Sequence, residues 1–306
     1  MQHYRSLEHV QITAPTVLSI GKFNGMHLGH QHLLAQVVAR ARQIGGESAA
    51  LTFEPHPTLV LQPEHERVYL APESERLALL DATGIDHLIV LRFDQTLMQL
   101  TAEAYMRNLC DHVNLRELWV GPDMRVGYQR QGTVEVLRQL GEQFGYTIHP
   151  IEKLLVEGAP ISATRIRSLL QAGAVEQIPA LLGRPFAVVG EVVQGDQRGR
   201  TIGFPTANIA VARHDLLPAD GVYACRVTLA DGAQHNAVTN VGVRPTFGVL
   251  NRTVEAHLLD WSGDLYGQQV RAAFIERIRP ERKFSGIDEL KAQIALDAAR
   301  AREILA

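Results

Sequence analysis

Two short stretches of this sequence combine residue types that suit phosphate chemistry. In the first, GKFNGMHLGHQH (residues 21–32), His27 and His30 stand three positions apart among glycines. An apolar run at 17–20 precedes them and a helical pattern follows, which indicates the junction between a strand of a parallel sheet and a helix. Ligands bind at the carboxyl ends of parallel strands, and the free N–H groups of a helix N-terminus attract phosphate. We therefore expect the two imidazoles to donate hydrogen bonds to a triphosphate and to stabilise charge that develops on phosphorus.

Other interpretations of these histidines stay open. His27, His30 and His32 allow a zinc site, although no cysteine or carboxylate ligand lies nearby in the sequence. A chain with 13 histidines can also contain this spacing by chance, in which case the side chains simply lie at the surface. The neighbouring glycines favour nucleotide binding, because Gly21 and Gly25 allow a ligand to approach the backbone closely.

The second stretch, GRTIGFPTAN (residues 199–208), predicts a separate ATP site. It is not a P-loop, because the one Gly-Lys pair in the chain, Gly21-Lys22, is followed by a phenylalanine. If 206–208 is extended, Thr206 and Asn208 point the same way, and their oxygens are ligands that Mg²⁺ accepts. The glycines would line a close path around phosphates, and the arginines would add positive charge. The ATP-binding residues expected here are Gly195, Arg198, Gly199, Arg200, Gly203, Pro205, Thr206 and Asn208.

A later strand pattern carries a candidate base. In TVEAHLL (253–259), alternation places Val254 and Ala256 on one face and Glu255 and His257 on the other. Phosphoryl transfer needs a base near the acceptor hydroxyl, and a carboxylate can serve as one. From the residues alone, a solvated glutamate on a glycine-rich hairpin stays open as the alternative.

The elements that must position these residues fall into two groups. Apolar runs alternate with helical patterns up to about residue 151, which is typical of a doubly wound parallel α/β sheet. Beyond LLGRP (181–185), short strand patterns separated by turn residues predict a small antiparallel β-barrel. A terminal helix is expected from about Ser285, with Ser285 and Asp288 as a capping box. The residues expected to pack this helix on the barrel are Ile287, Leu290, Ile294 and Ala298. We expect domains at 1–183 and 184–306, and helices at 28–44, 73–83, 101–110, 132–145, 163–171 and 174–182.

Composition narrows the class of protein. The chain has 306 residues, 46% of them hydrophobic and 21% charged, as in ordinary globular proteins. Its net charge of −3 argues against nucleic-acid binding, and no apolar run approaches the roughly 18 residues of a membrane span. Two distant cysteines suggest neither a disulfide framework nor a zinc site, and the N-terminus lacks a secretory pattern. We expect a cytoplasmic protein without nucleic-acid or membrane partners.

The motifs together resemble a known family. GKFNGMHLGHQHLL is similar to the HxGH signature of the nucleotidyltransferase superfamily, and TFEPHP (52–57), VGPDMRVGYQRQG (120–132) and ISATRIR (161–167) follow it. This order resembles that of bacterial bifunctional riboflavin kinase/FMN adenylyltransferases, also called FAD synthetases. GRPF, GDQRGRTIGFPTANI and LYG resemble the kinase half of the same family, so the resemblance spans essentially the whole chain. It implies that riboflavin and ATP give FMN, and that FMN and ATP then give FAD and pyrophosphate, with Mg²⁺ accompanying ATP.

The resemblance also implies roles for individual residues. Glu255 would take the proton from the riboflavin 5′-hydroxyl, while His27 and His30 would bind the ATP phosphates as catalytic residues. Ser162, Thr164 and Arg165 would close over the phosphates from the other side. The remaining positions are an ATP-binding loop of Gly21, Phe23, Asn24 and Gly25, and a flavin pocket of Phe53, Pro55, His56 and Pro57 with Asp123 near the flavin or its ribityl chain.

The sequence departs from the family at several positions. Asn24 replaces the usual aspartate of FDG, Met124 and Val126 replace two phenylalanines of DFRFG, and ISST reads ISAT. These changes predict slower or altered adenylyl transfer, because they remove a charge and stacking surface. Alternatives are a riboflavin kinase with an impaired N-terminal half and a non-enzymatic flavin or nucleotide carrier. A tRNA synthetase-like enzyme is disfavoured because no KMSKS-type loop is present. The oligomeric state stays open.

Overall fold

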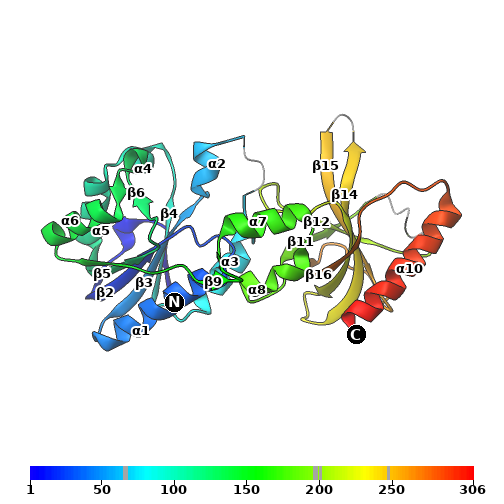
Figure 1. The fold of residues 1–306 in the computed structure, drawn as a ribbon, viewed down its shortest axis with the longest axis horizontal. Coiled ribbons are helices and arrows are strands. Elements are labelled where there is room, and N and C mark those ends of the chain that lie inside the picture. The colour runs from blue at the N-terminus through cyan, green and yellow to red at the C-terminus, as the bar shows by residue number, and fades with distance from the viewer. Residues whose placement is uncertain (65–67, 196–198, 200–201, 247–248) are drawn as a thin grey trace. The chain divides into compact units, whose positions relative to one another are not determined.

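The computed structural model describes the chain except for residues 65–67, 196–198, 200, 201, 247 and 248; the side chains of 244–246 and 249–251 are also not described. It contains two compact units (Figure 1). The first comprises Met1–Val68 and Glu73–Ile161, and the second comprises Tyr69–Pro72 and Ser162–Ala306.

The first unit is built on a six-stranded sheet in which every neighbouring pair is parallel. The order is β1-β4-β3-β2-β5-β8, so β3 and β4 lie on one side of β2 and β5 and β8 on the other. Such a reversal creates a ligand-binding crevice at the carboxyl ends of the central strands. The predicted doubly wound sheet is confirmed. Its strands are β1 (Gln2–Tyr4), β2 (Ile12–Ile20), β3 (Glu47–Glu54), β4 (His87–Arg92), β5 (Val113–Val120) and β8 (Thr147–Pro150).

Helices cover both faces of this sheet, which explains why its strands are apolar on both sides. On one face, Leu51 and Leu118 pack with Met106 of α5, and on the other, Ala50 and Leu88 pack with helix α1. The helices are α1 (Leu28–Gln43), α2 (Pro57–Leu61), α3 (Glu73–Asp81), α4 (Gln95–Gln99), α5 (Ala102–His112) and α6 (Val134–Phe144). The smaller elements are η1 (Leu7–His9), η2 (Tyr128–Arg130), and the short strand pairs β6 (Arg125–Val126) with β7 (Gly132–Thr133) and β9 (Leu155–Val156) with β10 (Ala159–Pro160).

The second unit contains the predicted antiparallel barrel, which is closed in the order β11-β12-β15-β14-β13-β16. Thr239, Val241, Val254 and Ala256 are at most 1% exposed, so these alternate residues line its interior. Helix α10 packs on the outer face of β13, β14 and β16 and runs along the barrel (Figure 1). The elements are β11 (Ala187–Val193), β12 (Ala207–Ala210), β13 (Gly221–Thr228), β14 (Gln234–Thr246), β15 (Val249–Leu258), β16 (Gln269–Arg279) and α10 (Ile287–Leu305).

Two helix predictions in this unit were wrong in detail. The helix expected at 174–182 is broken into η3 (Val175–Gln177) and α8 (Pro179–Leu182), because proline cannot donate a helical hydrogen bond and its ring clashes with the preceding turn. The capping box is absent because Gly286 is the N-cap of α10, and Ser285 instead donates from its N and Oγ to Glu289. Ile287 therefore lies at the open end of the helix and is 62% exposed.

The segment before the barrel belongs to the second compact unit. Helix α7 (Ala163–Ala172) ends at Gly173, and Ala219 N donates to the carbonyl of Leu170 at 2.8 Å. Arg277 Nη1 donates to the carbonyl of Ala172 at 3.4 Å, and η3 packs against β16. The compact units thus divide at 161/162, whereas the sequence analysis placed the domain boundary at 183/184. None of the helices in the described part of the chain is long and apolar enough to cross a membrane.

These contacts predict that a barrel fragment is more stable with α7, η3 and α8 than without them. Fragment 162–306 should melt roughly 10 °C above fragment 184–306, because the shorter one loses several buried apolar side chains worth a few kcal/mol. Thermal unfolding followed by circular dichroism checks this. Equal melting temperatures would show that the helices contribute nothing to the barrel.

Candidate active sites

The loop that follows β2 is buried and tightly turned. Phe23, Gly25 and Met26 all have positive φ values, of 42°, 77° and 43°. Asn24 is 2% exposed, and its Nδ2 donates to the carbonyl of Val68 at 2.8 Å. The Phe23 ring is also buried, in the core beneath the loop. The buried side chains of Phe23 and Asn24 therefore hold the loop in place. The loop itself lies at the carboxyl end of β2.

His27 and His30 stand together at the start of α1. His27 is the N-cap, and its Nδ1 accepts from the backbone N of His30 at 3.3 Å. The two rings stack with their centroids 3.7 Å apart, and the Phe23 ring contacts His30 edge-on at 5.3 Å. A Cβ on Gly29 would lie 3.2 Å from the His27 ring, so glycine keeps this face open. The predicted junction of strand, histidines and helix is confirmed.

Burial keeps both imidazoles neutral. Desolvation lowers the pKa of His27 to about 4, and it lowers the pKa of His30 well below 6.5, with a smaller contribution from the repulsion that would arise if both rings were protonated. Because His27 Nδ1 accepts a hydrogen bond, its proton resides on Nε2. The Nδ1 atom of His30 is buried and has no hydrogen-bond partner within the described residues. The pair therefore offers neutral N–H donors beside a helix N-terminus, a combination that binds anions.

The zinc interpretation requires His32 to converge with this pair, and it does not. His32 is exposed, and its Nε2 lies 2.6 Å from Gln36 Nε2 one turn along the helix. The described residues contain no group of three or more His, Cys, Asp or Glu side chains that could hold a metal ion.

An ion pair links the C-terminal part of α1 to β5. Arg40 donates from Nε and Nη2 to the Glu117 carboxylate at 2.9 and 2.7 Å, and Trp119 Nε1 donates to it at 2.9 Å. These hydrogen bonds, led by that from Arg40, lower the pKa of Glu117. Glu117 therefore stays ionised at neutral pH, and the ion pair fixes the helix whose N-terminus carries the histidines.

The residues expected to bind flavin lie at the carboxyl ends of β3 and β5. Phe53 contacts Phe93 edge-on at 5.7 Å, and a cis peptide bond joins Glu54 to Pro55. His56 is 3% exposed and its Nδ1 accepts from the backbone N of Thr58, so it caps α2, which begins at Pro57.

Asp123 is open to solvent near the same edge. Its side chain is 73% exposed and accepts from Lys153 Nζ at 2.9 Å. That hydrogen bond lowers the pKa of Asp123. The sequence analysis did not single out Lys153, which lies 30 residues away and belongs to no motif.

Ser162, Thr164 and Arg165 occupy the first turn of α7. Ser162 is the N-cap, and its Oγ accepts from the backbone N of Arg165 at 3.2 Å. These three residues belong to the second compact unit, whereas His27 and His30 belong to the first.

The barrel brings the second set of predicted residues together. Asn208 on β12 lies directly opposite Glu255 on β15, and the predicted alternation is confirmed because Val254 and Ala256 face the interior. Thr253 Oγ1 donates to Glu255 Oε1 at 3.3 Å. His257 Nδ1 donates to the Pro205 carbonyl at 2.7 Å, which ties the end of the glycine-rich segment to the same strand.

The glycines of this segment meet two requirements, the close approach of neighbouring atoms and a positive φ. A Cβ on Gly195 would lie 2.5 Å from Asn208 Nδ2, and one on Gly199 would lie 2.3 Å from the Phe204 carbonyl oxygen. Gly203 has a φ of 89°, which favours glycine. Arg198 and Arg200, which the sequence analysis included, lie outside the described residues. A loop of this kind can lay backbone N–H groups along phosphates above a hydroxyl, an amide and a carboxylate.

Two protein-family models match this chain, one over each half. A model described as FAD synthetase matches residues 9–165, and a model described as riboflavin kinase matches residues 182–305.

Individual relatives match nearly the whole chain. The bifunctional riboflavin kinase/FMN adenylyltransferase of Escherichia coli K12 is 37% identical over 94% of this chain and 92% of its own. That of Haemophilus influenzae is 34% identical over 99% and 98% of the two chains, and that of Bacillus subtilis 34% over 94% and 92%. A crystal structure described as a macrolide-efflux protein from Streptococcus pneumoniae superposes with a TM-score of 0.89 at 30% identity, over 98% of each chain.

The buried histidines predict that acid destabilises the protein. Because the pKa of His27 falls from 6.5 in the unfolded chain to about 4 in the folded one, the unfolded chain binds more protons between these values. The stability contributed by neutral His27 is complete above pH 6.5 and is lost as the pH falls towards 4. His27→Gln should therefore show a weaker fall in melting temperature between about pH 7 and about pH 4.5 than the parent protein.

The control for this measurement is His32→Gln, which makes the same change at an exposed position of the same helix. An unchanged pH dependence in His27→Gln would contradict the argument.

The Asn24 hydrogen bond predicts that Asn24→Asp is destabilising. A carboxylate cannot donate to the Val68 carbonyl, so the substitution replaces a buried hydrogen bond by repulsion between two oxygens, at a cost of about 1–3 kcal/mol or more because one oxygen is charged. The deficit should shrink at low pH, where a protonated carboxyl group can donate again. Denaturant unfolding at two pH values measures this, and a variant as stable as the parent at neutral pH would contradict it.

Proposed function

Since the chain belongs to the family of bifunctional riboflavin kinase/FMN adenylyltransferases, it phosphorylates riboflavin to FMN and adenylylates FMN to FAD, and we propose which of its residues perform each step. The proposal assigns adenylyl transfer to 1–183 and the kinase to 184–306. The limits of the two family matches, 9–165 and 182–305, support this division. The substrates are the small molecules ATP, riboflavin and FMN.

In adenylyl transfer, an oxygen of the FMN phosphate attacks the α-phosphorus of ATP, and the bond from that phosphorus to the bridging oxygen of pyrophosphate breaks. His27 and His30 bind the phosphates through neutral N–H donors, which stabilise the charge that grows on the phosphoryl oxygens. The N-terminus of α1 adds its unpaired backbone N–H groups. Ser162, Thr164 and Arg165 bind the leaving pyrophosphate through hydroxyl and guanidinium donors.

The flavin of FMN binds beside Phe53, Pro55, His56 and Pro57, at the carboxyl end of β3. Asp123 accepts a hydrogen bond from the flavin or its ribityl chain, and its ionised state, which Lys153 stabilises, suits an acceptor. The location of both segments at carboxyl ends of parallel strands supports this assignment.

In the kinase step, the riboflavin 5′-oxygen attacks the γ-phosphorus of ATP while Glu255 takes the hydroxyl proton, and ADP leaves. The observation that carries this proposal is the register that places Glu255 directly opposite Asn208. The loop of Gly195, Gly199, Gly203 and Pro205, with Arg198 and Arg200, binds the ATP phosphates.

Mg²⁺ is the metal that the donor set fits. Thr206 and Asn208 provide a hydroxyl and an amide oxygen, and Gly195 leaves a space beside the Asn208 amide that any Cβ would fill. We assign Mg²⁺ to these two residues, where it would neutralise phosphate charge during transfer. What the chain itself supplies is Asn208 on β12, directly opposite Glu255, with Thr206 just before the strand.

One observation favours the second candidate, a kinase with an impaired first half. Met124 and Val126, which stand where the family has phenylalanines, pack against the hydrophobic core of the first unit, and Asn24 is engaged with Val68. None of these three offers stacking surface or charge to a nucleotide. A cytoplasmic location completes the proposal, and the two free thiols, Cys110 and Cys225, are consistent with reducing surroundings.

One assay on three proteins tests these assignments. The parent protein, incubated with riboflavin, ATP and Mg²⁺, should form FMN and FAD that chromatography separates. Glu255→Gln should lose about 10²–10⁴-fold in FMN formation, the usual range for a general base, yet still convert supplied FMN to FAD. His30→Ala should show the opposite pattern. FMN alone from the parent would support the second candidate, and near-normal kinase activity in Glu255→Gln would exclude it as the base.

A further inference from the structure

Glu255 is flanked across the barrel wall by two asparagines. Asn208 lies opposite it on β12, and Asn240 lies opposite it on β14. Opposed residues on antiparallel strands project from the same face, with Cβ atoms roughly 4.5–5.5 Å apart. The neighbours of Asn240 in the chain, Thr239 and Val241, face the barrel interior, so Asn240 shares the outer face with Glu255. The functional proposal above gives Asn208 a role and leaves Asn240 without one.

The Asn240 amide is held by a carboxylate from the segment that joins β16 to α10. Its Nδ2 donates to Glu281 Oε1 at 3.0 Å. The same carboxylate lies over Gly242, where a Cβ would come within 2.0 Å of Oε1. Gly242 has no positive φ, so its backbone does not require glycine. The missing side chain at Gly242 instead makes room for Glu281 beside Asn240.

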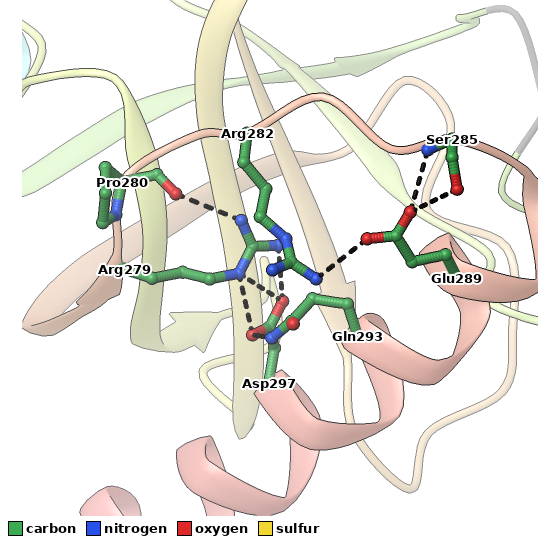
Figure 2. A network of polar contacts seen from close by, with 7 residues as sticks. All are labelled: Arg279, Pro280, Arg282, Ser285, Glu289, Gln293 and Asp297. Atoms are coloured by element: carbon green, nitrogen blue, oxygen red, sulfur yellow. Dashed lines mark hydrogen bonds and ion pairs between the residues drawn. The ribbon is translucent and has the colours of Figure 1, made fainter.

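The segment that carries Glu281 is fixed at both ends to α10 (Figure 2). Arg279 donates from Nε and Nη2 to the Asp297 carboxylate at 3.0 and 2.7 Å, and this carboxylate is only 3% exposed. At the other end, Ser285 donates from N and Oγ to Glu289 at 2.8 and 2.7 Å. Because residues 280–284 are tied down on either side, Glu281 loses little conformational entropy when it binds Asn240.

We propose that Asn240 is a positioning residue for Glu255 in the kinase reaction, and that Glu281 orients Asn240. An amide NH₂ group has two donors, and the one that Glu281 leaves can serve the Glu255 carboxylate on the same face. Thr253 already donates to Glu255 Oε1 along the strand. With donors along and across the sheet, the carboxylate presents a defined lone pair to the substrate hydroxyl. This inference rests on the proposed role of Glu255 as base.

The test is steady-state kinetics of riboflavin phosphorylation by the full chain. Asn240→Ala should lower kcat about 10-fold, the effect of losing one hydrogen bond to a charged group, with KM for riboflavin and ATP unchanged. Glu281→Ala should lower kcat less, and Glu281→Gln should recover most of that loss because it keeps an acceptor oxygen. Gly242→Ala should resemble Glu281→Ala, since the new methyl group displaces the carboxylate.

A double-mutant cycle separates positioning from general support of the fold. In a Glu255→Gln background, Asn240→Ala should cause no further loss of kcat, because the residue acts through Glu255. A merely structural role would reduce the rate again by the same factor. Asn236→Ala is the matched control, since it makes the same change on the same face of β14, four residues away. Thermal unfolding of each variant, followed by circular dichroism, reports whether the barrel is intact.

Each outcome decides the inference. An unchanged kcat in Asn240→Ala, or an equal loss in the Glu255→Gln background, overturns it even where Glu255→Gln alone abolishes the kinase. Near-normal kinase activity in Glu255→Gln overturns the proposed base instead, and is distinguishable because it appears in the single variant. Should Asn240→Ala be unstable, Asn240→Asp keeps the side chain's size, removes both donors and should lose at least as much kcat.

Discussion

The strand register of the closed barrel is the constraint on which the kinase site depends. Each strand pairs on both sides, so β15 cannot shift without breaking two ladders. A slip of one residue would turn Glu255 into the interior and expose Val254. The apolar residues that fill the barrel therefore also determine which polar residues share its outer face. Packing and catalysis therefore follow from the same alternation.

The site in the first unit differs, because neutral N–H groups rather than buried positive charges are available to bind anions. Burial of the stacked histidines favours their neutral forms, and the helix N-terminus beside them supplies further N–H donors. The tightly turned loop that precedes them is held from below by Phe23 and Asn24. Such a site attracts phosphate by directed hydrogen bonds, whose strength depends on keeping the backbone rigid.

Local patterns in the sequence predicted most of the helices, strands and site residues. Contacts between residues that are distant in the sequence could not be predicted. The alternation in β15 and the start of α1 follow from neighbouring side chains, and both were correct. Pro179 broke a predicted helix, and the α10 cap moved by one residue because Gly286 takes the N-cap position. Asn24 lies 44 residues from Val68, and Asn240 lies 41 from Glu281, so no periodicity reveals either contact.

The central claim is that one chain holds two independent ATP sites, one dependent on His30 and the other on Glu255. Mixing the His30→Ala and Glu255→Gln proteins with riboflavin, ATP and Mg²⁺ tests it most directly. Neither variant alone should make appreciable FAD from riboflavin, whereas the mixture should make it, because FMN released by the first protein is adenylylated by the second. A mixture that forms no more FAD than the two proteins separately would contradict the claim.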